Sequence, residues 1–162
     1  MGIRHLVLLG CLCLLAACGF TLRGTASLPD TLQPLYLEAI DDDSDMQREL
    51  RRTLTNNDVQ LSDTPAAMMY RLGIGQEQND ERAISVNVNA RAGEYELSMT
   101  VPFQLRYGTE LILGPERLTV TRVYLADPEN AVAKNREAEQ IQREMRQDLS
   151  QQILRRLQVL AL

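Results

Sequence analysis

Histidine, tryptophan and free thiols are almost missing from this chain of 162 residues. It has no tryptophan, one histidine (His5) and three cysteines, Cys11, Cys13 and Cys18, all within the first 18 residues. Catalytic triads with a histidine base, and zinc sites built from His and Cys, need these side chains. The sequence also lacks a glycine-rich phosphate loop and a dinucleotide-binding fingerprint. We therefore expect no catalytic site, no metal site and no cofactor.

Basic residues are outnumbered, with 17 Lys and Arg against 22 Asp and Glu and a net charge of −5. A general nucleic-acid binder normally carries a basic excess, so we expect no nucleic-acid partner. All the basic residues except Lys134 are arginines. The planar guanidinium group suits contacts with phosphate and carboxylate, so selective binding of an anion stays open.

The N-terminus has the features of a secretion signal. Arg4 and His5 precede an apolar run over residues 6–14, and Ala16 and Ala17 supply the small residues of a cleavage site, which predicts a signal peptide over residues 1–17. The apolar run is shorter than the ~20 residues that a membrane-spanning helix requires. An ordinary secretory signal with a chance cysteine, or an uncleaved membrane helix, are the alternatives.

The segment Leu15-Ala16-Ala17-Cys18 resembles the lipobox of bacterial lipoproteins, whose cysteine receives a diacylglyceryl group and a third acyl chain. The resemblance implies lipidation at Cys18. Several acyl chains give a lasting membrane anchor, since each buried methylene contributes ~0.8 kcal/mol. Gly19 in place of Asp resembles the class directed to the outer membrane. Residues 18–33, with several Gly, Ser and Thr, are expected to form the lipidated N-terminus and a tether, and residues 34–162 a single α+β domain.

The first part of this domain predicts a strand followed by a helix. Residues 35–40 form a short apolar strand candidate. Ser44 and Gln47 match a capping box at the start of a helix. The apolar face of that helix consists of Met46, Leu50 and Leu54. Asn56 and Asn57 are a plausible end, because Asn tolerates the left-handed conformation found there.

The middle of the chain changes to the period of two that is typical of strands. A brief strand at 59–61 and an apolar run over 68–74 precede a polar turn at 78–80, and Ile84, Val86 and Val88 then alternate with polar residues. Residues 95–107 alternate without interruption. A hairpin is expected at Ala92-Gly93, Pro102 suggests an edge position or a bulge, and a last strand covers about 111–125 with an interruption near Gly114-Pro115.

A long helix is expected at the end of the chain, with Asp127 as its cap and Pro128 in its first turn. Its apolar stripe comprises Ile141, Met145, Leu149, Ile153 and Leu157, widened by Leu154 and Leu160. The opposite face, which we interpret as solvated, carries Arg136, Glu139, Arg143, Arg146 and Gln147.

These elements, in the order β-α-β-β-β-α, predict an α+β fold. We expect a two-layer sandwich in which two helices pack on one face of a mostly antiparallel four- or five-stranded sheet. The other face is left open, either to solvent or as a contact surface. It would display Ser85, Asn87, Asn89, Arg91, Glu96, Ser98, Thr100, Gln104 and Arg106.

Four pieces of the sequence together resemble the LptE family of lipopolysaccharide-assembly lipoproteins, also called RlpB. They are residues 18–23 after the lipobox, Pro29, Glu94-Tyr95 at the start of the long strand, and the segment from Asp127 through Lys134 and Glu144-Met145 to Leu157. The resemblance implies a lipid-anchored protein on the periplasmic side of the cell outer membrane. It also implies a non-enzymatic plug in the lumen of the β-barrel LptD, which assists barrel assembly and the transfer of lipopolysaccharide to the outer leaflet.

The resemblance further implies that basic residues bind lipopolysaccharide. Lys134 matches a lysine of the family, although a surface lysine in the second turn of a helix is the simpler interpretation. The family's other basic position falls on Val88, so Arg91 either replaces it or only pairs with Glu94. A different barrel partner or a structural tether is an alternative function. A hydrolase that uses Glu94 and Glu96, which a strand would place on one face, is a further one.

Overall fold

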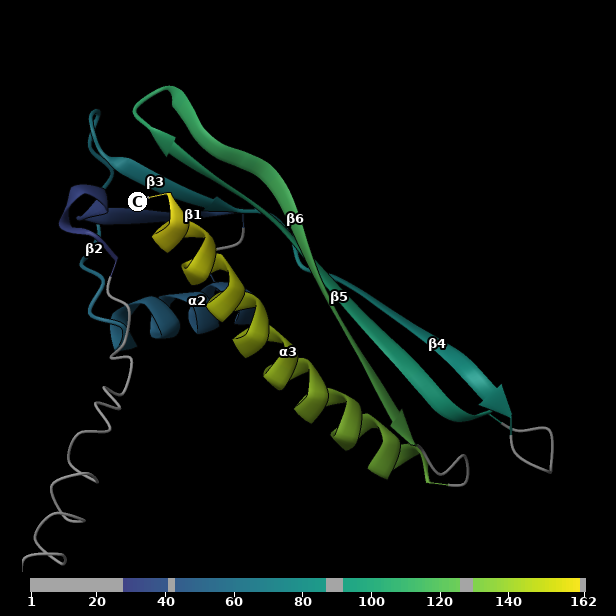
Figure 1. The fold of residues 1–162 in the computed structure, drawn as a ribbon. Helices are drawn as coiled ribbons and strands as arrows, with labels where there is room; N and C mark the ends of the chain where they lie inside the picture. The colour runs from purple at the N-terminus through teal and green to yellow at the C-terminus, as the bar shows by residue number, and fades with distance from the viewer. Residues whose placement is uncertain (1–27, 41–42, 87–91, 126–129, 161–162) are drawn as a thin grey trace, which may run out of the picture.

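The computed structural model describes residues 28–40, 43–86, 92–125 and 130–160. Cys18, Arg91, Val88 and Asp127 lie outside these residues. The described elements are shown in Figure 1 and follow in chain order: a 3₁₀ turn η1 (Asp30–Leu32), β1 (Leu35–Ala39), α2 (Asp45–Asn56), β2 (Leu61–Ser62), β3 (Tyr70–Ile74), β4 (Gln78–Val86), β5 (Ala92–Tyr107), β6 (Glu110–Leu125) and α3 (Ala131–Val159).

The sheet is organised around β5. One edge of β5 pairs with β6, and the other edge pairs first with β4 and then, further along, with β3. β1 lies parallel to both β3 and β2, whereas all the other pairs are antiparallel. The α+β fold is thus confirmed. The described residues contain six strands in a mixed sheet, where four or five mostly antiparallel strands were expected.

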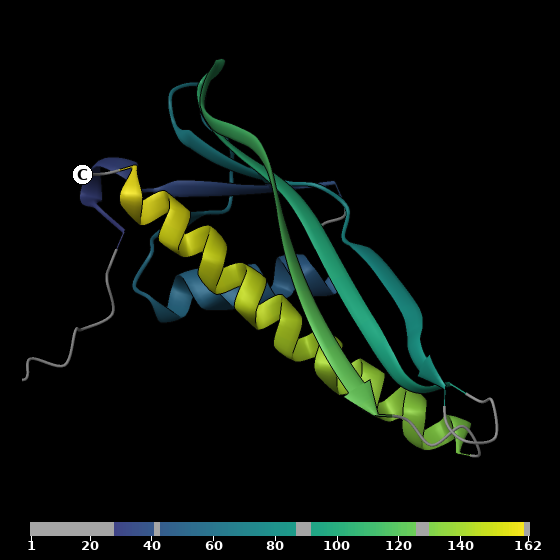
Figure 2. The same cartoon turned by 45° about the vertical axis from the view of Figure 1, so that its right-hand side comes forward.

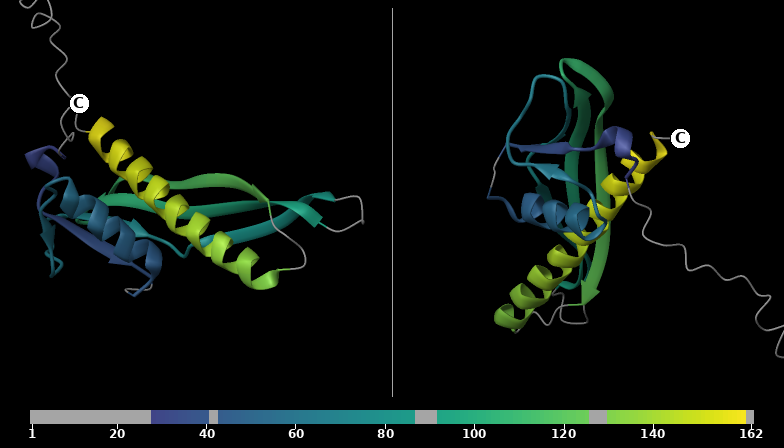
Figure 3. Two further views of the ribbon diagram at one scale, coloured as in Figure 1. Left: turned by 90° about the horizontal axis from the view of Figure 1, so that it is seen from below. Right: turned by 90° about the vertical axis from the view of Figure 1, so that its left-hand side faces the viewer.

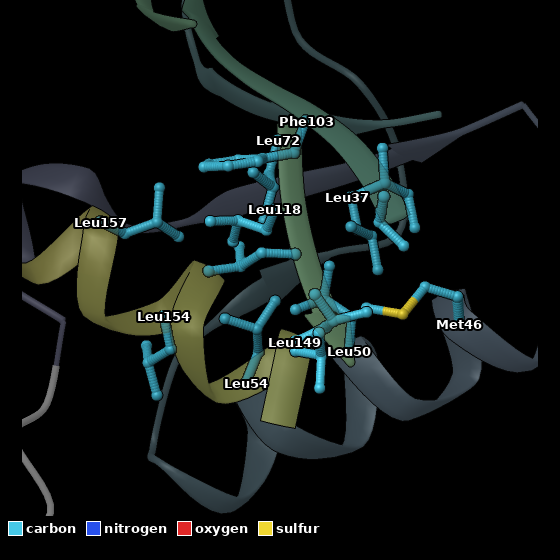
Figure 4. Packing of buried hydrophobic residues seen from close by; sticks show 14 of the residues in the cluster. Leu37, Met46, Leu50, Leu54, Leu72, Phe103, Leu118, Leu149, Leu154 and Leu157 are labelled. Atoms are coloured by element: carbon cyan, nitrogen blue, oxygen red, sulfur yellow. The ribbon is translucent and has the colours of Figure 1, made fainter. Parts of the chain in front are cut away.

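Both helices cover the same face of the sheet. Met46, Leu50 and Leu54 of α2 and the stripe of α3 from Met145 to Leu157 are buried against the strands. The strands contribute alternate residues, which in β5 are Leu97, Met99, Val101, Phe103 and Leu105. Figure 4 shows side chains of both helices meeting those of the strands in one core. Each fully buried side chain of this size contributes about 1.5–3 kcal/mol, so the two stripes hold the layers together.

The molecule is elongated along α3, as Figures 2 and 3 show. At one end lie η1, β1, the first described residue and the end of α3. We call the opposite end, formed by the end of β4, the start of β5, the end of β6 and the first turns of α3, the distal end. The place where the chain enters the domain is therefore separated from the distal end by nearly the whole length of α3.

Two expectations at the boundaries of elements were wrong. Leu28 and Leu32 are buried in the core, so the folded part overlaps the expected tether at 18–33. Residues 78–80 begin β4 and do not form a turn. Their side chains give no apolar alternation, and the pairing with β5 decides their conformation.

Pro102 does not lie on an edge strand, because β5 is paired on both sides. Its carbonyl accepts a hydrogen bond of 2.8 Å from the Gly75 N–H, in the short segment between the end of β3 and the start of β4. The missing N–H of Pro102 thus falls where the ladder is interrupted, which explains why a proline is tolerated there. The irregularities of the β5–β6 ladder lie just beyond it, between Phe103 and Arg106.

The helix ends agree in part with expectation. Ser44 caps α2 by accepting a 3.2 Å hydrogen bond from the Gln47 N–H. The left-handed residue after α2 is Asp58, with φ 59°, and not an asparagine. α3 begins at Ala131 with Asn130 as its cap, whose side chain accepts from the Ala133 N–H at 3.0 Å.

Three side chains have a different environment from the one expected. Arg146 is not solvated. Its guanidinium group donates to the carboxylate of Glu77, with Nε and Nη2 at 2.7 and 2.9 Å from the two carboxylate oxygens. Ile84 lies beside a bulge of β4 and is 44% exposed, and Leu160 at the end of α3 is 39% exposed, so neither is a core residue. In the part of the chain that the structure describes, no helix has the length and apolar character of a membrane span.

Candidate functional site

Four elements meet at the distal end around Lys134. α3 contributes Lys134, β4 contributes Glu81, and the paired residues Tyr95 of β5 and Tyr124 of β6 provide the aromatic rings. All three strand residues lie on the sheet face that the helices cover, because Glu81 is paired with the buried Leu97 two residues beyond Tyr95. We call these four residues the Lys134 cluster.

The ammonium group of Lys134 has two neighbours. Its Nζ lies 2.5 Å from Glu81 Oε1 and 3.7 Å from the centroid of the Tyr95 ring. An ammonium group over an aromatic face gains a cation–π interaction of about 0.5–1 kcal/mol at an exposed site. Lys134 and Glu81 keep 23% and 33% of their side chains exposed, so solvent and a solvent-borne ligand have access to the pair.

The second carboxylate oxygen of Glu81 is also engaged. Tyr124 donates its hydroxyl hydrogen to Oε2 at 3.0 Å, and its ring stacks on Tyr95 with centroids 5.6 Å apart. Burial, followed by the hydrogen bond to Glu81, raises the pKa of Tyr124 above its ordinary range. The phenol therefore stays protonated at neutral pH and remains a donor.

The contact with Glu81 also stabilises the charged form of Lys134. The hydrogen bond to Glu81 raises the pKa of the Lys134 ammonium, against the smaller opposing effect of desolvation. Lys134 belongs to the first turn of α3, since its N–H donates to the Asn130 carbonyl, and not to the second turn as expected. The positive end of the helix dipole disfavours a cation there, so Glu81 offsets this cost.

The open face of the sheet is mainly polar over the described residues, as expected, but the end of β6 also exposes Val123 and Leu125 beside Glu96 and Glu94. Thr100 and Thr119, paired across β5 and β6, share a hydrogen bond of 2.8 Å between their hydroxyl groups. Glu94 and Glu96 lie on this face, but Glu96 is engaged by Arg82 at 2.7 Å. The two carboxylates are thus not an isolated acid pair.

A groove of about 1060 Å³ lies between α2 and α3. Its walls carry both signs of charge, and several of these charged side chains are paired with one another, as Arg48 is with Asp45 and Arg52 with Glu49.

Among the described residues, no cluster of Asp, Glu, His or Cys is arranged to hold a metal ion.

The structure places only one predicted lipopolysaccharide-binding residue, Lys134, within the described chain. Arg91 and the lipidation site Cys18 lie outside it, so their roles stay predictions. Glu81 and Tyr124 were missed by the sequence analysis. Glu81 stands 53 residues before Lys134 in the chain, and no local pattern links the two.

Comparisons with known proteins cover most of the chain. A family model described as "LptE: Lipopolysaccharide-assembly" matches residues 32–157 of this chain. The LPS-assembly lipoprotein LptE of Yersinia enterocolitica serotype O:8 / biotype 1B is 35% identical over an alignment of 167 residues, covering 96% of this chain and 77% of that protein.

Solved structures agree with this family match. The rare lipoprotein B of Shewanella oneidensis superposes with a TM-score of 0.68 at 29% identity, covering 76% of this chain and 92% of that one. A minor lipoprotein of Acinetobacter baumannii gives a TM-score of 0.64 at 28% identity, with 77% and 90% covered. The similarity therefore extends over both helices and the sheet.

Proposed function

Because the chain belongs to the LptE family and acts in lipopolysaccharide assembly, we propose that it is a non-catalytic partner of an LptD-like outer-membrane β-barrel. In this role it occupies the barrel lumen and contacts lipopolysaccharide on its way to the outer leaflet. The anchor is the lipidated Cys18, on the periplasmic side of the outer membrane.

The surface of the domain supports a position inside a barrel. Large barrels have polar interiors and are often plugged by a separate domain. The open face of the sheet presents hydroxyl groups such as those of Thr100 and Thr119, and its charges at Arg82 and Glu96 neutralise each other. Such a face can form hydrogen bonds with the polar inner wall of a barrel, and it does not need an opposite charge at a fixed position on that wall.

The Lys134 cluster is the observation that carries the contact with lipopolysaccharide. It offers a partly exposed cation, a positive helix end and two aromatic rings in one place. Phosphate groups are favoured by both the ammonium and the N-terminus of α3. In this proposal Arg91, next to the described start of β5, adds a second cation that can hold phosphate in a bidentate manner.

The length of the domain fits a protein anchored at one leaflet and active near the other. Lys134 and Val159 are separated by 25 residues of α3, or roughly 38 Å at 1.5 Å per residue. A bilayer measures ~40–45 Å with its headgroups. Cys18 precedes Leu28, the first described residue, by a segment that spans at most about 35 Å. A domain that stands upright in the lumen thus brings Lys134 to the level of the outer headgroups.

Two measurements test this proposal. The chain, expressed with its own leader, is purified from membranes in mild detergent, and the captured partner is identified; a one-to-one complex with a large β-barrel is expected. Repeated capture of a different barrel would favour the alternative assembly lipoprotein, and capture without any barrel would refute the plug.

The second measurement addresses the lipid contact. Lys134→Ala is compared with Arg136→Ala, which removes an equal charge two residues along α3. We expect weaker binding of purified lipopolysaccharide only in Lys134→Ala. Equal binding by both variants would remove Lys134 from the site.

A further inference from the structure

Lys134 is not a free cation in this structure, because Glu81 already holds it at 2.5 Å. We propose that Glu81 is a built-in competitor of the anionic ligand: its carboxylate pairs with the Lys134 ammonium that a phosphate would otherwise bind, and it sets the affinity of the site. This inference rests on the proposed contact between Lys134 and lipopolysaccharide, and adds the residue that opposes that contact.

The competition follows from charge. The ammonium group has three N–H donors but only one positive charge. A phosphate within hydrogen-bond distance of Nζ, with the Glu81 carboxylate still in place, puts two anions side by side, which is unfavourable. Ligand binding therefore requires the separation of Lys134 from Glu81.

Lys134 is the partner that moves. The carboxylate of Glu81 keeps a second hydrogen bond from Tyr124, whose buried ring is fixed by stacking on Tyr95. Lys134 reaches the carboxylate through a flexible four-carbon stem, so a change of side-chain rotamer is enough to redirect Nζ. Tyr124 makes the exchange less costly, since the carboxylate is not left without a donor.

The charged neighbours of Glu81 on β4 cannot pair with Lys134 in its place. Asp80 and Arg82 point to the opposite face of the sheet, because successive side chains of a strand alternate and their partners Ser98 and Glu96 belong to the open face. Asp80 thus provides a matched control, since Asp80→Asn removes the same charge one residue away from Glu81.

The test is a double-mutant cycle on the full-length chain in detergent, with purified lipopolysaccharide as the probe. Glu81→Gln keeps the shape of the side chain and an oxygen for Tyr124, but removes the charge. An ion pair of this exposure contributes up to about 1 kcal/mol, so we expect Glu81→Gln to bind about fivefold more tightly than the wild type. Asp80→Asn is expected to change the affinity less than about twofold, because it leaves the pair intact.

The double variant Lys134→Ala/Glu81→Gln and the single variants together separate the proposed competition by Glu81 from the proposed lipid contact of Lys134. In the Lys134→Ala background, Glu81→Gln should give no gain, because the cation that it releases is absent. If Lys134→Ala weakens binding and Glu81→Gln does not strengthen it, the competition is refuted and the lipid contact stands. If Lys134→Ala binds like the wild type, the lipid contact itself fails.

Circular dichroism confirms that each variant is folded. Should Glu81→Gln fail to fold, Glu81→Asp replaces it: the shorter side chain withdraws the carboxylate from Lys134 by one methylene, and tighter binding is again expected. Unchanged or weaker binding by Glu81→Asp would then overturn the inference.

Discussion

Arg146→Met should be among the more destabilising single substitutions outside the hydrophobic core. Arg146 and Glu77 keep only 12% and 13% of their side chains exposed, and two hydrogen bonds of 2.7 and 2.9 Å join them. Removing one partner of a buried pair leaves an uncompensated charge, at a cost of about 3–5 kcal/mol. The second partner of Arg146, Asp45 at 3.5 Å, cannot reduce this loss, because it does not satisfy Glu77.

We take the lower limit of this range, about 3 kcal/mol, because a small fraction of each side chain still meets solvent. For a domain of this size the loss lowers Tm by about 10 °C. The double variant Arg146→Met/Glu77→Met should regain most of it, since apolar replacement of both members of a buried pair is often neutral.

Urea denaturation followed by circular dichroism measures these differences. The control is Arg122→Met, which breaks an ion pair with Asp148 whose side chains are 44% and 46% exposed. Exposed pairs contribute about 0–1 kcal/mol, so this variant should remain close to the wild type. A loss below about 1 kcal/mol in Arg146→Met, or a double variant no more stable than the single one, would refute the reasoning.

Three further predictions concern local features. Glu81→Gln should lower the pKa of Lys134, measured through the Cε resonance of this single lysine, and an unchanged pKa would contradict the pairing. Because that pKa is raised above its ordinary value of 10.5 in the folded protein, the stability that the pair provides is complete below about pH 10 and is lost as the pH rises through the raised pKa. Ser44→Ala should lower the free energy of unfolding by about 1 kcal/mol through the lost cap, and a neutral result would show that the cap is dispensable. Gly75→Ala should be destabilising by about 1–3 kcal/mol, since a Cβ there would lie 2.5 Å from Pro102 Cγ; wild-type stability would show that β5 yields at this point.

The parts of the fold with a strong local period were predictable. The alternation from Tyr95 to Tyr107 gave most of β5, and the stripe of α3 correctly gave Met145, Leu149 and Ile153 as core residues. Both patterns arise because one face of the element is buried. A buried face produces a regular apolar period in the sequence, whatever element it packs against.

The parts that depend on distant partners were not predictable. The start of β4 is polar on both faces, and only its pairing with β5 makes it a strand. Arg146 resembles the other charged residues of its helix until Glu77 is placed beside it. The same holds for the candidate site: Lys134 was found from its motif, whereas its counter-ion Glu81 is defined by tertiary structure alone.

The successive pairing of β3 and β4 with one edge of β5 has a consequence for insertions and deletions. Only residues 75–77 separate the two strands, so the length of this segment determines which side chains of β4 face the helices. A shift by one residue would turn Glu81 to the open face and bring Asp80 or Arg82 toward Lys134. A segment one residue longer or shorter would then place near Lys134 either the shorter carboxylate of Asp80 or the like charge of Arg82, and chain length alone would retune the site.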